Sequence, residues 1–307
     1  MPQVVTVTMN PALDIATSAD AVHPTDKIRC GSPRYDPGGG GINVARVIRR
    51  LGGDALAVFP AGGAAGMALD ALLDREHLLY CRVPISGTTR ESFTVDELRS
   101  GQQYRFVLPG PTLTREEWRA CLARLARLAD GARFIVASGS LPPGVPADFF
   151  QQVADLAKRL GTRLVLDTSG DALRQTRSGA YLLKPSLREL REWVGRDLLD
   201  EAAQVAAARS LIAQGVGEVM VVSLGGKGAL LVTAEEAERL APINVPVRSA
   251  VGAGVSLVGA IVLGLTNGLD LRHAVRLGMA AGAATLMTPG TELCRREDVE
   301  RLYAVSS

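Results

Sequence analysis

The sequence predicts an α/β fold in which a mostly parallel sheet lies between two layers of helices, with a small antiparallel β unit attached. From residue 114 onward, helical segments alternate with short apolar strands, which is typical of a parallel sheet covered on both faces. Between residues 86 and 108 the apolar positions instead alternate with period two around the turn 99–101, which indicates a β-hairpin. The 307 residues are long enough for one large domain with a well-buried core.

The expected elements follow from the period of the apolar residues and from glycine stops such as 52–53. The N-terminal part has a β-branched strand 4–9, a glycine loop 38–41, a helix 42–51, a strand 56–59, a helix 67–73 and hairpin strands 92–95 and 104–107, to which residues 16–35 add further strands. The rest has helices 115–129, 147–160, 187–194, 202–214, 254–265, 271–287 and 296–303, and strands 134–137, 163–166, 181–183, 219–222 and 229–232.

The composition excludes several classes of protein. Hydrophobic residues make up 47% and charged residues 21%, an ordinary globular mixture, and a net charge of +2 gives no support to nucleic-acid binding. The four cysteines and three histidines are scattered, which argues against a disulfide framework or a zinc site. Residues 249–269 carry no charge and are long enough to span a bilayer, but they contain five glycines and lack flanking Trp or Tyr. We therefore expect a cytoplasmic protein with neither a nucleic-acid nor a membrane partner, and no signal peptide.

Three polar features of the N-terminal third could bind a ligand. Glycines 38–41 lead into a helix, where bare backbone could approach an anion or a polyol, although a flexible turn is the alternative. Asp14 follows the first strand and could accept bonds from sugar hydroxyls, while the residues alone favour a turn or capping role. Arg90 and Arg105 could clamp a phosphate, but solvated arginines on a strand edge are the simpler interpretation.

Two motifs in the C-terminal half are less specific. Residues 223–228, SLGGKG, lack both the Walker ending and the GxGxxG spacing, so a tight turn is the alternative to a nucleotide contact. The segment SGS at 138–140 is not a GxSxG elbow, which disfavours a serine hydrolase.

The segment SAVGAGVSLVGA at residues 249–260 combines a glycine pair with a helix start. Free N–H groups at Gly252, Ala253 and Gly254 would suit charge that develops on a transferring phosphate, whereas close helix packing is the alternative reason for small residues. The next side chain, Val255, can perform no acid–base chemistry.

Together these motifs resemble the PfkB (ribokinase-like) sugar kinases, and within them the branch of ATP-dependent 6-phosphofructokinases, 1-phosphofructokinases and tagatose-6-phosphate kinases. The resemblance runs from Val4 to nearly the C-terminus. It implies a single domain, residues 1–307, with a Rossmann-like three-layer core and a β lid formed by about residues 12–35 and 86–110. The lid would close over the sugar and make a homodimer contact. The motifs are TMNPALD (8–14), DPGGGGINVAR (36–46), FPAGG (59–63), QYRFVLPGP (103–111), SGSLPPG (138–144), VVSLGGKGAL (221–230) and VGAG (251–254).

The resemblance also implies which residues bind the ligands. A sugar-phosphate site would comprise Asp14, Lys27, Gly39, Gly40, Asn43, Arg90, Arg105 and Ser140. ATP would lie near Lys184, Ser186, Ser223, Gly225 and Gly228, with its phosphates at Gly252, Ala253 and Gly254. Glu189 would organise Mg²⁺ through water, and a monovalent cation, K⁺, would bind around Ser249, Val251, Thr285, Thr288 and Gly290. Glu292, near this cation site, stands where relatives have arginine.

The chain departs from the family pattern at two positions. Ser186 replaces the asparagine of the Asn-x-x-Glu motif, and Val255 replaces the aspartate that acts as general base. The resemblance thus predicts phosphorylation of fructose 6-phosphate by a catalytically impaired chain. Two alternatives remain: another acceptor, as in 1-phosphofructokinase or tagatose-6-phosphate kinase, or a non-catalytic pseudokinase that binds sugar phosphate or nucleotide.

Overall fold

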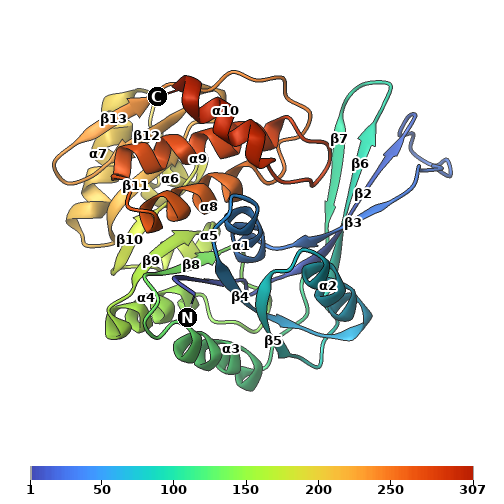
Figure 1. Ribbon diagram of the computed structural model, residues 1–307, viewed down its shortest axis with the longest axis horizontal. Helices are drawn as coiled ribbons and strands as arrows, with labels where there is room; N and C mark the ends of the chain where they lie inside the picture. The colour runs from blue at the N-terminus through green and yellow to red at the C-terminus, as the bar shows by residue number, and fades with distance from the viewer. Residues whose placement is uncertain (1, 307) are drawn as a thin grey trace.

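The computed structural model describes residues 2–306 and contains a nine-stranded and a four-stranded sheet (Figure 1). The nine-stranded sheet is parallel from β5 to β11 and continues with two antiparallel strands, β12 and β13. Its strands, in spatial order, are β13 (Ala237–Leu240), β12 (Ala229–Val232), β11 (Gly217–Ser223), β10 (Ala180–Leu183), β9 (Arg163–Asp167), β8 (Phe134–Ser138), β1 (Val4–Val7), β4 (Ala55–Ala61) and β5 (Leu79–Pro84).

Helices cover both faces of this sheet because its central strands are apolar on both sides. Val5 and Val7 of β1 pack into one hydrophobic cluster, while Val4 packs into the other. The first cluster lies under α3 (Arg115–Leu128), α4 (Phe149–Leu160), α5 (Gly170–Arg174), α6 (Leu187–Val194) and α7 (Glu201–Ala213). The second lies under α1 (Gly40–Arg50), α2 (Gly63–Arg75), α8 (Ala253–Thr266) and α9 (Leu271–Leu286), and α10 (Arg296–Ser306) packs beside α9.

The four-stranded sheet, called here the small sheet, projects from one side of the molecule (Figure 1). Strand β2 pairs in parallel with β6, and the other two pairings are antiparallel. The register places Asp14, Arg90 and Arg105 on one face, and Phe93 and Phe106 on the other. The strands are β3 (Arg34–Gly38), β2 (Ala12–Ala19), β6 (Arg90–Glu97) and β7 (Gln103–Val107), in that order.

The structure confirms the predicted α/β class, and each predicted helix and strand is present; α6 and β12 have the predicted bounds, and the others have shifted ends. Three elements were missed: β5, α5 and β13. Strands β5 and β13 lie at the two edges of the large sheet. Strand β13 (AERL) is polar at its centre, and β5 (LYCRVP) has neither the period-two alternation nor the β-branched run that marks a strand. Helix α5 spans only five residues, too few for a helical period to be recognised. Within residues 2–306 every helix is too short or too polar to cross a bilayer.

Candidate active site

The first turn of α8 is an uncapped helix N-terminus. Gly252 precedes the helix in a left-handed conformation (φ 83°), which glycine adopts without strain. Neither a side-chain cap nor an acidic residue occupies the first turn of α8. The N–H groups of Ala253, Gly254 and Val255 are therefore free to bind an anion, with the positive end of the helix dipole behind them.

Two cavities meet at this turn. Gly252 and Val255 line a cavity of about 210 Å³ under the small sheet, here called the small-sheet cavity. Ala253 and Gly254 line a second, mainly apolar cavity of about 360 Å³. The small-sheet cavity brings together eight of the predicted residues: Asp14, Gly39, Gly40, Asn43, Arg90, Arg105, Val251 and Gly252, with Val255 beside them.

Asp14 lies on the cavity face of β2, directly against the glycine loop. A Cβ atom built on Gly38 would lie 2.5 Å from the Asp14 carboxylate, so only glycine fits opposite it. Burial raises the pKa of Asp14, and the nearby Arg90 and Arg105 only partly oppose this effect. Asp14 is not a helix cap; it is a desolvated carboxylate facing two arginines.

We expect Asp14→Asn to make the folded chain more stable at neutral pH. Because folding raises the pKa of Asp14, its ionised form opposes folding at every pH above the usual value of 3.8, and this penalty disappears as the pH falls below it. Urea unfolding of both chains from pH 7 toward pH 4 should show a stability difference that shrinks as the pH falls. A difference that grows in acid would contradict this assignment.

Arg90 is held by main-chain carbonyls and lines the small-sheet cavity. Its Nη2 donates to Asn10 O (3.1 Å) and its Nη1 to Leu108 O (3.2 Å). Its Nε is buried and has no hydrogen-bond partner among the described residues. Arg105 lies opposite Thr94 on the neighbouring strand and is exposed. Together they place positive charge in the roof of the small-sheet cavity.

Glycines 38–41, of which Gly40 and Gly41 form the start of α1, are tightly packed and are not a flexible turn. A Cβ on Gly40 would lie 2.3 Å from Ser138 Oγ, and one on Gly41 would lie 2.5 Å from Val7 O. Thr8 Oγ1 accepts a hydrogen bond from Ile42 N at 2.7 Å. The absence of side chains at this loop is thus what allows α1 to start against the carboxyl ends of β1 and β8.

Two residues predicted for the sugar-phosphate site lie outside the lining of the small-sheet cavity. Lys27 is exposed on the loop between β2 and β3. Ser140 is exposed as well, and its Oγ accepts a hydrogen bond from Asn10 Nδ2 at 3.0 Å. Their proposed contacts require either movement of the small sheet or a ligand that extends beyond the cavity.

Three of the five residues predicted to bind the nucleotide line the apolar cavity. Ser223, Gly225 and Gly228 line it, and Ser186 forms a bridge with Ser223. The short 3₁₀ turn η1 (Gly225–Lys227) shapes this rim. The apolar wall, which the sequence analysis missed because it comes from a loop and two helices, includes Ile243, Val245, Val247, Leu257 and Met279.

Lys184 reaches the α8 turn from the carboxyl end of β10. A Cβ on Gly254 would lie 3.7 Å from Lys184 Nζ. Burial alone would lower the pKa of Lys184, but the Asp167 carboxylate 3.1 Å away outweighs it, so the pKa lies above its usual value and the ammonium stays charged. Asp167 also accepts a bond from Ser138 Oγ at 3.1 Å. Sequence reasoning missed Asp167, although a carboxylate at the carboxyl end of a parallel strand was a usable signal.

The predicted metal ligands have oxygen donors but form no dense cluster. Ser186 and Glu189 make a capping box at α6, in which Glu189 Oε2 accepts a hydrogen bond from Ser186 N at 2.7 Å. Near the predicted cation site, Ser249 Oγ donates to Gly290 O (2.7 Å) and Thr288 Oγ1 to Thr285 O (2.8 Å), while Val251 N donates to Ser249 Oγ. Residues 2–306 contain no group of three or more His, Cys, Asp or Glu side chains able to hold a metal.

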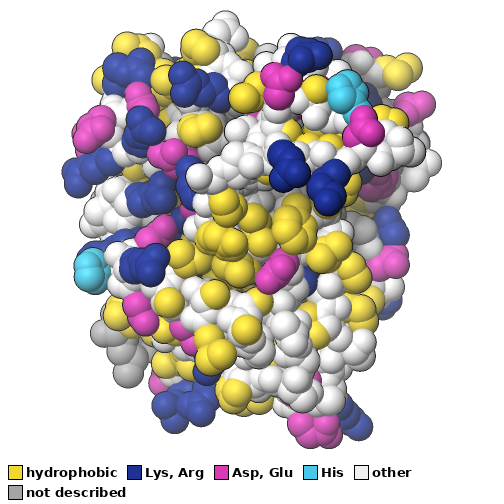
Figure 2. Space-filling model, turned by 90° about the vertical axis from the view of Figure 1, so that its right-hand side faces the viewer, with side chains coloured by type: hydrophobic (Ala, Val, Ile, Leu, Met, Phe, Trp, Pro, Cys, Tyr) yellow, Lys and Arg dark blue, Asp and Glu magenta, His cyan; other side chains and the backbone are white. Residues whose placement is uncertain are grey.

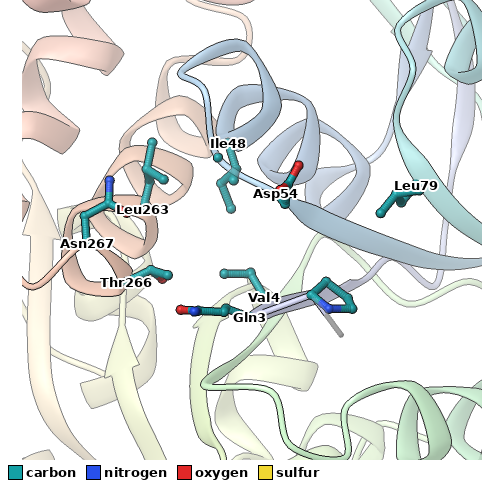
Figure 3. A pocket seen from close by; sticks show the side chains of 10 residues that line it. Gln3, Val4, Ile48, Asp54, Leu79, Leu263, Thr266 and Asn267 are labelled. Carbon is teal, nitrogen blue, oxygen red and sulfur yellow. The ribbon is translucent and has the colours of Figure 1, made fainter.

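A larger cavity of about 650 Å³ lies at the opposite end of the sheet (Figure 3). It opens beside Gln3 and Val4 at the start of β1 and Thr266 at the end of α8. The one charged residue in its described lining, Asp54, is paired with Arg49 at 3.3 Å. The described lining has no cluster of charged side chains and no free helix N-terminus, so we assign no ligand or reaction to this cavity.

Comparison with known proteins assigns the chain to a family. The model described as "pfkB family carbohydrate kinase" matches residues 7–298. The ATP-dependent 6-phosphofructokinase isozyme 2 of Mycobacterium tuberculosis is 56% identical over 306 residues, covering 100% of this chain and 90% of that relative. Two solved structures of Escherichia coli phosphofructokinase-2 superpose closely on this chain.

The complex with potassium has a TM-score of 0.95, with 41% identity over 99% of both chains. The complex with fructose-6-phosphate has a TM-score of 0.94, with 40% identity over 100% of this chain and 99% of the other. The chain therefore belongs to the PfkB family of carbohydrate kinases.

Proposed function

We propose that the chain binds fructose 6-phosphate in the small-sheet cavity and ATP in the apolar cavity, as a 6-phosphofructokinase whose turnover is impaired. The observation that carries this proposal is the meeting of the two cavities at the uncapped turn Gly252–Gly254. A phosphoryl group bound at this turn would lie between ATP, its donor, and the sugar phosphate, its acceptor. The name of the Mycobacterium tuberculosis relative and the solved Escherichia coli complex with fructose-6-phosphate support the choice of substrate.

The chain's own residues would then act by position and charge. Arg90 and Arg105 would hold the acceptor's phosphate, and Asp14 would accept bonds from sugar hydroxyls. The N–H groups of the α8 turn and the charged Lys184 would stabilise negative charge on the phosphoryl group in transfer. Mg²⁺, placed through water by Glu189, would neutralise the nucleotide phosphates, and K⁺ near Ser249 and Gly290 would support the α8 loop.

Val255 lacks the group that takes the proton from the acceptor hydroxyl. Its half-buried side chain lines the small-sheet cavity at the third residue of α8. We therefore expect binding to persist while the chemical step slows. A non-catalytic pseudokinase is the second candidate, and Val255 is the observation that favours it; the retention of Asp14, Asn43 and both arginines favours an impaired kinase.

The test is ATP-dependent phosphorylation of fructose 6-phosphate, fructose 1-phosphate and tagatose 6-phosphate by this chain and by Val255→Asp. Fructose 6-phosphate should be the preferred acceptor, with activity rising in the aspartate form. Preference for another acceptor would assign the chain to 1-phosphofructokinase or tagatose-6-phosphate kinase. Inactivity of both forms, with sugar phosphate still bound, would favour the pseudokinase.

We also propose that the small sheet is a lid covered on its outer face by a second copy of the chain. The register aligns Tyr35, Ile15, Phe93 and Phe106 in one row across all four strands, on the face opposite Asp14 and the arginines. Phe106 is 54% exposed. Figure 2, which shows the side of the molecule that carries the small sheet, has hydrophobic side chains gathered in its middle. An apolar sheet face of this kind is typical of a protein interface.

Phe106→Glu should convert a dimer into a monomer, because a charge buried in an apolar interface is not solvated. Sedimentation velocity at micromolar protein would measure the change. Leu199→Glu is the matched control: Leu199 is 86% exposed on the loop between α6 and α7, away from the small sheet, and its replacement should leave the dimer intact. A chain that is monomeric before substitution would refute the interface.

A further inference from the structure

Arg46 is a fully buried charged side chain in the part of the chain that the structure describes. Burying a guanidinium is unfavourable unless its N–H groups all find partners. Arg46 Nε and Nη2 donate to the two carboxylate oxygens of Glu76, at 2.7 and 2.5 Å. Arg46 Nη1 donates to Pro37 O and to Asn43 Oδ1, both at 2.9 Å. The side chain thus joins α2 to the glycine loop and to one wall of the small-sheet cavity.

This contact decides which end of the Asn43 amide is left for a ligand. A guanidinium has donors and no acceptor, so Asn43 must turn its oxygen toward Arg46. The remaining Nδ2 group can only donate. Asn43 lines the small-sheet cavity together with Gly40 and Arg90. Asn43 therefore offers a ligand in the cavity an N–H donor, which suits a phosphate or hydroxyl oxygen.

Glu76 keeps Arg46 in place. Burial would raise the pKa of Glu76, but hydrogen bonds and charge from Arg46, assisted by Arg50, outweigh it and lower the pKa below its usual value. Glu76 therefore stays ionised, and the two parallel bonds hold the guanidinium in one orientation. Arg50 touches the same carboxylate at 3.5 Å. Its other bond goes to Leu293 O, away from Asn43.

We propose that Arg46 is a positioning residue for the sugar phosphate: through Asn43 Oδ1 it commits the Asn43 amide to donate into the small-sheet cavity. This inference rests on the proposed function. It extends the sugar-phosphate site to a residue and a helix, α2, that do not touch the cavity.

A double-mutant cycle tests the proposal, with the dissociation constant for fructose 6-phosphate measured by calorimetry. Arg46→Lys keeps the charge beside Glu76 but cannot also hold Asn43, so binding should weaken about tenfold, the effect of one hydrogen bond. Asn43→Ala should weaken it similarly, and the double variant should bind no more weakly than Asn43→Ala alone. Arg50→Lys is the matched control, because Arg50 lies on the same helix as Arg46 and contacts the same Glu76 carboxylate; it should leave sugar-phosphate binding unchanged. None of these variants should change the affinity for ATP.

Asn43→Asp provides a readout that a purely structural role would not move. Its carboxylate would pair with Arg46, so the melting temperature should hold or rise, while sugar-phosphate binding is lost because an acceptor replaces the donor. If Arg46→Lys does not fold, Glu76→Gln can replace it in the test. This variant should also weaken fructose 6-phosphate binding, but by less, because it loosens the Arg46 guanidinium without removing it.

Several outcomes would overturn the proposal. Additive losses in the cycle, or unchanged binding by Arg46→Lys, would show that Arg46 does not act through Asn43. Tight sugar-phosphate binding by Asn43→Asp would show that the amide is not a donor to the ligand. Failure of the unaltered chain to bind any of the three sugar phosphates would instead overturn the proposed function, and this inference with it.

Discussion

Val255→Asp should raise the turnover of fructose 6-phosphate by about 10²–10⁴-fold, the usual contribution of a positioned general base. Residue 255 lies in the first turn of α8 and lines the same cavity as Asp14 and both arginines. A carboxylate has nearly the volume of the valine side chain, so it can occupy this place without repacking the core. The helix N-terminus also stabilises a negative charge there. Steady-state rates with saturating ATP and acceptor measure the effect.

Val255→Asn is the matched control for this prediction. It has the shape and polarity of the aspartate form but accepts no proton at neutral pH, so turnover should stay near that of the chain with valine. ATP affinity supplies a second check. Valine removes a negative charge facing the γ-phosphate, so ATP should bind this chain at least as tightly as it binds Val255→Asp. Full turnover by the unaltered chain, or clearly weaker ATP binding, would refute this account of position 255.

Arg90→Ala should weaken fructose 6-phosphate binding by about 30-fold, near the lower end of what loss of one partner from a hydrogen-bonded charge pair produces. Arg90 is anchored by Asn10 O and Leu108 O, so its guanidinium is already held in place before a ligand arrives. Arg105→Ala should have a smaller and more salt-dependent effect, because Arg105 is exposed and its charge is screened. Calorimetry at two salt concentrations would separate the two arginines.

The control for the arginines is Arg99→Ala in the turn of the same hairpin. Arg99 pairs with Asp20 at 2.8 Å, and both side chains are largely exposed, so its loss should not change sugar-phosphate affinity. Unphosphorylated fructose provides a second control, since Arg90→Ala should not selectively weaken its binding. An equal loss for fructose and fructose 6-phosphate would mean that Arg90 does not bind the phosphate.

The order of helices and strands could be predicted because the core strands are buried on both faces and the helices carry a clear apolar period. The edge strands β5 and β13 could not, since β13 has Glu238 and Arg239 at its centre and β5, interrupted by Arg82, shows neither alternation nor a β-branched run. The same contrast holds at the site. Glycines 38–41 and the Gly252–Gly254 turn are consecutive in the chain and visible as motifs. The wall of the apolar cavity draws Val247, Leu257 and Met279 from a loop and two helices, and no local pattern joins them.

Asp14 and Arg90 show why local reasoning alone misjudged single residues. On their own, a turn aspartate and a solvated edge arginine were the simpler interpretations. The register of β2 with β6 places both side chains on the same face of the small sheet, over the α8 turn, and burial then changes their electrostatics. Resemblance to a family supplied the roles that the residues by themselves left open.

The sequence by itself predicted the fold class and the family and placed a valine at position 255, where the resemblance expects a base, because apolar strands, helical period and contiguous motifs are properties of neighbouring residues. Only the tertiary structure decided that one helix turn separates two cavities, that Lys27 and Ser140 lie outside the small-sheet cavity, and that Arg46 orients Asn43. Each of these depends on groups brought together from distant parts of the chain, where burial and hydrogen bonding, which no local pattern encodes, determine what a side chain can do.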